Sequence, residues 1–241
     1  MGENHFLYRT CVVHLKKSFT MRLRILVLSA LALVCLVIAY VMKLQQATQR
    51  SIPIYNPVDI DSSVVDTALR SVGHGHSIAP FQFTNQYNQI VSLADVKGKV
   101  FVVEYFFTTC GTICPKMNVQ MQRVQKAFEN NPKFKILSFT VNPEVDSVPQ
   151  MKMYAEGHGA IKGQWPFLTG DKKALYKTAR SSFFVLKPAE AQNLGDTGSD
   201  FIHTNNFVLI DKQLRIRGYY EGTSAKEVDR LIKDIPVLLE E

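Results

Sequence analysis

The hydrophobic pattern of the chain changes in character along its length. Residues 25–42 form an uninterrupted apolar stretch in which only Ser29 is polar. From about residue 76 onward, two kinds of segment alternate along the chain. Some are short apolar runs that alternate with period two, and others have helical periodicity. The first pattern predicts one transmembrane helix over residues 25–42. The second predicts an α/β domain over residues 76–241.

The α/β part starts with strands and then alternates helices with strands. Val100–Phe107 is a nearly continuous β-branched and aromatic run, which is typical of a central strand buried on both faces. Apolar residues recur at helical spacing from Met117 to Phe128, and Pro115 suits the first turn of that helix. We further expect strands at 81–84, 89–93, 134–141, 165–168, 207–210 and 214–220, and helices at 149–156, 171–180 and 224–239. This order predicts a thioredoxin-like fold with an N-terminal β-hairpin extension.

The positive charge of the chain is distributed unequally on the two sides of the apolar stretch. The net charge is +7, and most of it lies in the basic segment 1–24. A positive N-terminal flank predicts that residues 1–24 are cytoplasmic and that the C-terminal domain is extracytoplasmic, on the periplasmic side of the cell membrane. Residues 43–75 are then a linker and an extended lead-in. Because the remainder is only mildly basic, we expect no nucleic-acid partner.

Two other interpretations of the N-terminal region are less well supported. A cleaved signal peptide has a shorter apolar core and a small-residue cleavage site, which 25–42 lacks. A lipoprotein site at Cys35 is disfavoured because more apolar residues follow it. Met21 opens a segment that resembles a protein start, so the sequence leaves two candidate starts, Met1 and Met21; with the second, residues 1–20 would be a misassigned extension.

The chemistry-bearing residues are two cysteines placed between the predicted central strand and the next helix. Cys110 lies in the turn that leaves the strand, and Cys114 lies at the start of the helix. Free N–H groups and the helix dipole at a helix start stabilise an anion, so we expect a lowered pKa for a thiol there. The pair can form a disulfide or bind a metal. A purely structural disulfide is disfavoured because so short a loop gains little from closure.

A late histidine supplies a possible third ligand. His203 precedes the predicted strand 207–210, and a thioredoxin-like sheet brings that segment near the cysteine loop. Two thiolates and an imidazole form a soft metal site, for which the spacing alone leaves copper and zinc as equal candidates. Taken alone, however, such a histidine is more often a partly buried polar residue.

Four stretches together resemble the Sco/SenC family of copper-binding, thioredoxin-like proteins of cytochrome c oxidase assembly. The stretches are Tyr105–Pro115, Ser138–Pro149, Trp165–Gly170, and His203-Thr204 with Phe207–Asp211. The resemblance covers about residues 76–241, and the family usually carries an N-terminal membrane anchor. Asn142 and Thr204 depart from common family residues without removing a ligand.

The resemblance implies a function and a ligand set. Cys110, Cys114 and His203 match the family's copper ligands, and the loop 186–199 would let His203 move. The chain is then expected to be a membrane-anchored copper chaperone. It would bind one copper ion, Cu(I) or Cu(II), and deliver it to the dicopper-site subunit of a respiratory oxidase, with a thiol-reducing partner to renew the pair.

Alternative functions and minor candidates remain open. The same cysteines would serve a thiol-disulfide reductase that keeps a copper-receiving protein reduced, with either Cys114 or Cys110 attacking first. A peroxiredoxin-type peroxidase is disfavoured by the close spacing of the cysteines. We expect His74 and His76 to be an accessory metal pair only as a minor alternative, and the helical spacing of Met117 and Met121 favours core packing over copper binding. His158 is expected to be a solvated helix end, and Trp165 a packing residue.

Overall fold

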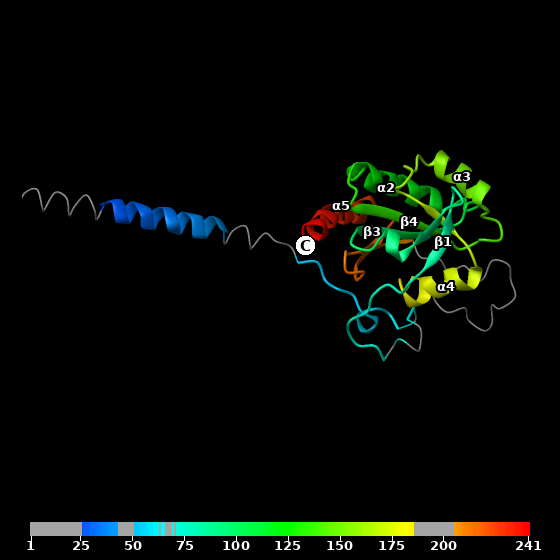
Figure 1. The fold of residues 1–241 in the computed structure, drawn as a ribbon, viewed down its shortest axis with the longest axis horizontal. Coiled ribbons are helices and arrows are strands. Elements are labelled where there is room, and N and C mark those ends of the chain that lie inside the picture. Colours follow the sequence, from blue (N-terminus) through cyan, green and yellow to red (C-terminus); the bar gives the residue numbers. More distant parts are fainter. Residues whose placement is uncertain (1–25, 43–50, 63, 66–68, 70, 186–204) are drawn as a thin grey trace, which may run out of the picture. The chain divides into compact units, whose positions relative to one another are not determined.

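The computed structural model describes residues 26–42, 51–62, 64–65, 69, 71–185 and 205–241. The chain divides into two compact units, Met1–Ser51 and Ile52–Glu241. In the first unit, residues 26–42 form an α-helix with exposed side chains (Figure 1). Across the described part of the chain, no helix is both long enough and apolar enough to cross a membrane. The membrane anchor expected at 25–42 therefore stays a prediction.

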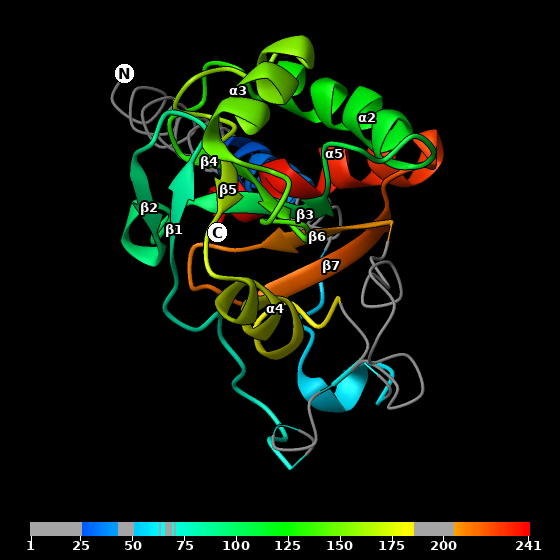
Figure 2. The same cartoon turned by 90° about the vertical axis from the view of Figure 1, so that its right-hand side faces the viewer.

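The second unit is built on one mixed β-sheet (Figure 2). Its seven strands, counted over the described residues, have the order β2-β1-β5-β4-β3-β6-β7. The strands are β1 Gln82–Asn85, β2 Ile90–Ser92, β3 Val100–Phe106, β4 Phe134–Thr140, β5 Phe167–Thr169, β6 Asn206–Ile210 and β7 Ile216–Glu221. Strands β3, β4 and β5 are parallel, and the N-terminal and C-terminal hairpins pair antiparallel to them. This arrangement confirms the thioredoxin-like fold with its N-terminal hairpin.

Helices begin where the sequence supplies suitable caps. The helices are α2 Cys114–Ala127, α3 Val148–Gly157, α4 Lys172–Ser181 and α5 Ala225–Glu240, with short 3-10 turns η1 Pro57–Asp59 and η3 Leu93–Asp95. Asp171 accepts a hydrogen bond from the N–H of Ala174 at 2.8 Å, and Ser224 caps α5 in the same way. The last strand begins later than the expected Leu214, because that residue lies in the hairpin turn with φ 65.

The central strand separates two hydrophobic cores. Along β3, the side chains of Val100, Val102 and Phe106 join a core with α2, α3 and α5. The alternate residues Phe101 and Val103 join a second core with α4. Figure 2 shows these two helical layers on opposite sides of the sheet. Burial on both faces is what the continuous apolar run predicts, and it fixes the end of β3 in space.

Residues assigned to packing by their spacing do lie in these cores. Met117 and Met121 of α2 are 1% and 0% exposed, and Trp165 is 0% exposed. The lead-in also contributes, because Ile52 is buried and Tyr55 forms a β-bridge with Ile216. Both cores consist entirely of residues from Ile52 onward. Among the described residues, the second unit therefore supplies both cores, and it is suited to study as a fragment.

Candidate thiol and metal site

The two cysteines lie in the connection between the end of β3 and the start of α2. The N–H of Cys110 donates to the carbonyl of Phe107 at 3.2 Å, which closes the turn after the strand. Cys114 is the first residue of α2, and Pro115 stands in the first turn. The N–H of Cys114 donates to Sγ of Cys110 at 3.4 Å. Both are free thiols, 8% and 1% exposed respectively, so the pair is adjacent and almost buried.

The electrostatics of the two thiols differ. Burial by itself would raise the pKa of the Cys110 thiol. Hydrogen bonds from the Cys114 thiol and from the backbone N–H groups of residues 112–114 outweigh burial and lower the pKa of Cys110 to about 7, from 9.0. Cys110 is therefore the better nucleophile and the first thiolate available to a metal.

The expectation of a lowered pKa for the helix-start cysteine is wrong. Burial, the hydrogen bond to Cys110 and the charges of Cys110 and Glu104 raise the pKa of Cys114. The N–H groups at the helix start are aimed at the sulfur of Cys110, four residues earlier, so the helix stabilises the neighbouring thiolate. The sequence correctly identified the helix start as the feature that stabilises a thiolate. It assigned that stabilisation to Cys114, whereas the structure gives it to Cys110.

Behind Cys114 lies a group of buried polar residues that sequence reasoning did not single out. Tyr154 has its pKa raised by burial and by the nearby charges of Cys114 and Glu104. Its hydroxyl accepts a hydrogen bond from the Asn118 amide at 2.6 Å. Asn118 follows Cys114 by one helical turn, a spacing that could have indicated its position. The site thus continues inward from the thiols.

Glu104 is a buried acidic residue near the thiols. It is 1% exposed, and burial raises the pKa of its carboxyl to about 7, while a hydrogen bond from Ser138 opposes that rise. Ser138 Oγ donates to Glu104 Oε1 at 2.5 Å and accepts from Trp165 Nε1 at 2.7 Å. The signal in the sequence is an acidic residue inside the apolar run 100–107.

The difference between the thiols predicts selective alkylation. In the reduced, copper-free fragment 52–241, iodoacetamide should modify Cys110 with a rate midpoint near pH 7, because only the thiolate reacts. Cys114 should stay protected until the protein unfolds. Peptide mass spectrometry over about pH 5 to about pH 9 measures both rates. Equal reaction of the two cysteines in folded protein would contradict the assignment.

His203 and the loop 186–199 lie outside the described residues. The approach of the imidazole to the cysteines therefore stays a prediction. Among the residues that are described, no group of three or more His, Cys, Asp or Glu side chains could hold a metal ion. Two of the three expected ligands are thus placed together, and the third is untested.

The other histidines have local packing roles. His76 is buried, its Nε2 lies 2.9 Å from the carbonyl oxygen of Ser182, and its ring packs on Phe184. That hydrogen bond occupies one of the two ring nitrogens, so an accessory metal pair with His74 stays a minor prediction. His158 lies at the end of α3 with its ring 4.5 Å from the ring of Tyr154, so it is partly packed and not simply solvated.

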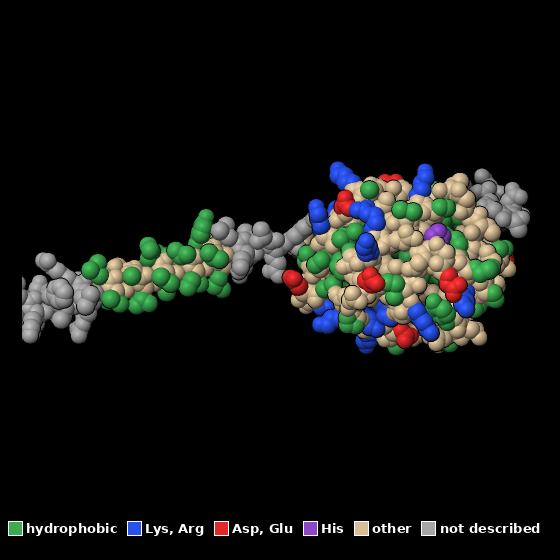
Figure 3. All heavy atoms as spheres, turned by 90° about the horizontal axis from the view of Figure 1, so that it is seen from above, with side chains coloured by type: hydrophobic (Ala, Val, Ile, Leu, Met, Phe, Trp, Pro, Cys, Tyr) green, Lys and Arg blue, Asp and Glu red, His purple; other side chains and the backbone are tan. Residues whose placement is uncertain are grey.

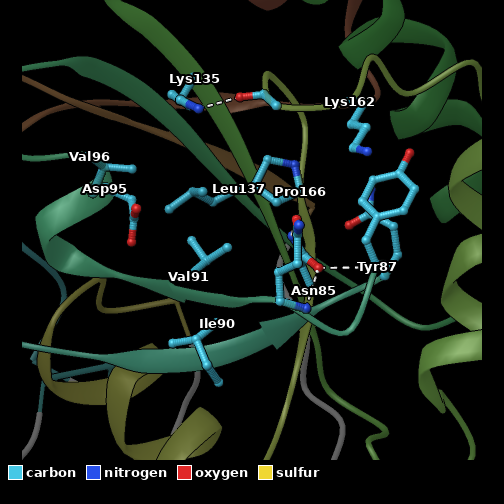
Figure 4. Close-up of a pocket in the computed structure, with 13 residues that line it drawn as sticks. Asn85, Tyr87, Ile90, Val91, Asp95, Val96, Lys135, Leu137, Lys162 and Pro166 are labelled. Carbon is cyan, nitrogen blue, oxygen red and sulfur yellow. Dashed lines mark hydrogen bonds between the residues drawn. The ribbon is translucent and has the colours of Figure 1, made fainter.

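A cavity of about 210 Å³ lies beside the N-terminal hairpin (Figure 4). Lys135 lines it from the start of β4, whereas the cysteines follow the end of β3, which is parallel to β4; the cavity is therefore at the opposite end of the sheet. Its polar groups have partners within the chain: Lys135 Nζ donates to Gly163, and Asn85 Oδ1 accepts the N–H of Tyr87 at 2.9 Å. The cavity is separate from the thiol chemistry.

On the face drawn in Figure 3, the described charged side chains do not gather into a second candidate site. On the face drawn in Figure 3, the described Lys and Arg side chains are scattered, with Asp and Glu side chains between them. A nucleic-acid site usually gathers basic residues into a stripe or patch. The expected absence of a nucleic-acid partner nevertheless stays a prediction.

Comparison with known proteins places this fold and this cysteine pair in a family. The SCO1/SenC family model matches residues 71–240. The SCO1 protein homolog of Bacillus subtilis (strain 168) is 33% identical over 162 residues, which are 66% of this chain and 81% of that protein. The solved structure of BsSco, a member of the Sco family of cytochrome c oxidase assembly proteins, has a TM-score of 0.57 at 31% identity and covers 68% of this chain and 93% of its own.

A copper-bound structure shares the fold. Bradyrhizobium japonicum ScoI with copper bound has a TM-score of 0.53 at 23% identity, covering 67% of this chain and 99% of its own. At that identity the likeness shows the fold alone. The family model spans more than half of the chain and includes both cysteines and His203. The chain therefore belongs to the SCO1/SenC family.

Proposed function

We propose that this protein is a membrane-anchored copper chaperone that binds one copper ion through Cys110, Cys114 and His203. It delivers the ion to the dicopper-site subunit of a respiratory cytochrome c oxidase. Residues 25–42 anchor it, with the compact unit on the periplasmic side of the membrane. A thiol-reducing partner restores the cysteines after oxidation.

The observation that carries this proposal is the adjacent pair of free thiols on a rigid frame. Cys110 and Cys114 lie between a strand that is buried on both faces and a helix. The N–H of Cys114 donates to Sγ of Cys110 at 3.4 Å. Thiolates are soft ligands that favour Cu(I), and a thiolate at Cys110 is available near neutral pH. This donor set fits copper as a transferable cargo, since three ligands leave one position open to a recipient.

The relatives support the choice of metal and recipient. Copper is bound in the structure of the Bradyrhizobium ScoI, and BsSco belongs to a family of cytochrome c oxidase assembly proteins. Zinc, which the spacing alone leaves equal, has no such support. We therefore assign copper and the oxidase to this chain as its proposed cargo and recipient.

Copper titration of the fragment 52–241 tests the proposal. Under anaerobic conditions we expect one Cu(I) or Cu(II) per chain, with thiolate-to-copper charge-transfer bands for Cu(II). Cys110→Ser and Cys114→Ser should each weaken binding by roughly hundredfold or more, because a lost ligand costs at least as much as a lost outer-sphere partner. Met121→Leu is the matched control, since that thioether is buried in the core and the exchange conserves volume.

Two results of this titration would count against the chaperone. Binding that survives both serine variants would remove the thiols from the site. Equally tight zinc binding with no thiolate-to-copper bands would point to zinc as the cargo.

A second function is favoured by the unequal thiols. A lowered pKa at Cys110 and a raised pKa at the buried Cys114 are typical of an attacking and a resolving cysteine in thiol-disulfide exchange. The fragment would then reduce a partner's disulfide as its own pair is oxidised. Rapid turnover of a disulfide substrate by metal-free protein, together with weak copper binding, would favour this reductase over the chaperone.

A further inference from the structure

A buried carboxylate ties the cysteine loop to the neighbouring strand. Asp146 is 0% exposed and lies in the loop between β4 and α3. Its Oδ1 accepts from the N–H of Thr108 at 3.1 Å and from the Thr108 hydroxyl at 2.5 Å. Its other oxygen accepts from the hydroxyl of Thr140 at the end of β4. The carboxylate therefore joins the ends of two adjacent parallel strands.

Thr108 stands directly before the thiol site. It is the second residue after β3 and precedes Cys110 by two positions. The next turn is set by the hydrogen bond from the N–H of Cys110 to Phe107. Whatever holds Thr108 thus fixes the point from which the cysteine loop departs. The alignment of the α2 N–H groups with the sulfur of Cys110 depends on that point.

The anchor is itself held firmly. The N–H of Asp146 donates to the carbonyl of Asn142 at 2.9 Å, and the N–H of Asn142 donates to Thr140 Oγ1 at 2.8 Å. A carboxylate accepts several hydrogen bonds at once, whereas an amide in its place offers one acceptor oxygen. Hydrogen bonds to a buried charge are also stronger than those between neutral groups. These contacts explain how an acidic side chain is accommodated with no exposed surface.

We propose that Asp146 is a positioning residue of the thiol site, which sets the Cys110 loop against β4 in the arrangement that lets the two sulfurs close on each other or share one copper ion. The copper part of this inference rests on the proposed function. The disulfide part does not, because two thiols this close can exchange with glutathione in the absence of metal.

The metal-free test measures how readily the pair closes. In a glutathione redox buffer, the two thiols and oxidised glutathione form the protein disulfide and two molecules of reduced glutathione. Asp146→Asn in the fragment 52–241 should lower this equilibrium constant by about tenfold, because a loosened loop lowers the effective concentration of one thiol near the other. Thr108→Val, which removes the hydroxyl arm and keeps the N–H contact, should lower it by about threefold.

Matched variants separate positioning from simple stability. Tyr176→Phe removes a buried hydrogen bond to the carbonyl of Val141 at 3.0 Å and leaves the hydrogen bonds of Asp146 in place, so the equilibrium constant should change by less than about twofold. Glu144→Gln changes an exposed carboxylate in the same loop and should change nothing. Thermal unfolding of each variant gives the stability effect for comparison. An equal shift in Asp146→Asn and Tyr176→Phe, or no shift in Asp146→Asn, would overturn the inference.

A second test of the inference measures copper binding in the same variants. Asp146→Asn should move the thiolate-to-copper charge-transfer band and weaken copper binding by about tenfold, while Tyr176→Phe keeps the wild-type spectrum. An unchanged spectrum and affinity in Asp146→Asn would count against positioning. If the wild-type fragment takes up no copper, the chaperone proposal fails, and the glutathione equilibrium still decides the role of Asp146.

Discussion

Replacing His203 by alanine is expected to abolish stable copper binding and to leave thiol-disulfide exchange intact. The imidazole is the third ligand of the proposed site, and its loss leaves two sulfur donors. Altered outer-sphere partners cost about tenfold to a hundredfold in metal affinity, so loss of a ligand should cost roughly hundredfold or more. Anaerobic copper titration of the fragment 52–241 measures the affinity, and a glutathione exchange assay measures the thiol chemistry.

The control for this variant is another histidine of the same unit. His74 is exposed, and His74→Ala should bind copper as wild type does. Unchanged copper affinity in His203→Ala would remove the third ligand, and the reductase would become the leading function. Loss of both copper binding and disulfide exchange would instead point to damage of the cysteine loop.

Replacing Glu104 by glutamine should change how stability depends on pH. Burial raises the pKa of Glu104 to about 7, from 4.5, so the folded protein holds this proton more tightly than the unfolded chain does. The resulting stabilisation is complete below the unfolded pKa and is lost as the pH rises through the folded pKa. At about 1.4 kcal/mol per pKa unit, the contribution of this carboxyl to the stability of the wild type should fall by about 3 kcal/mol between about pH 4 and about pH 8.

Urea unfolding of the fragment at several pH values measures this effect. Glu104→Gln keeps a hydrogen-bonding side chain next to Ser138 and cannot ionise, so its stability relative to wild type should rise across this pH range. Glu129→Gln, which alters an exposed carboxylate, should follow the wild type. A constant difference between Glu104→Gln and wild type would show that Glu104 stays charged or stays neutral throughout.

Local patterns were sufficient for most of the architecture. The run Val100–Phe107 predicted a central strand, and residues 100–106 form it with both faces buried. The helical spacing of Met117 and Met121 placed both side chains in the core, as the structure confirms. These features follow from the regular repeat of side-chain directions along a strand or a helix, which the backbone conformation of the element sets. The strand start predicted at Leu214 was wrong, because a residue with positive φ can interrupt a strand that hydropathy would extend.

The candidate site was only partly predictable. The sequence located Cys110 and Cys114 at a strand end and a helix start, and the structure places them together. It assigned the lowered pKa to the wrong cysteine, because the direction of the α2 N–H groups is a property of three-dimensional geometry. His203 lies outside the described residues, so its part in the site remains a prediction.

By itself, the sequence determined the order of strands and helices, the family, and the two thiols on which the proposed chemistry depends. Only the tertiary structure decided which of the two thiols has the lowered pKa and which distant side chains meet beside the cysteine loop. Asp146 reaches Thr108 across 38 positions of the chain, and Ser138 meets Glu104 across 34. Such contacts form when parallel strands align in register, and no local pattern of apolar and polar residues encodes that register completely.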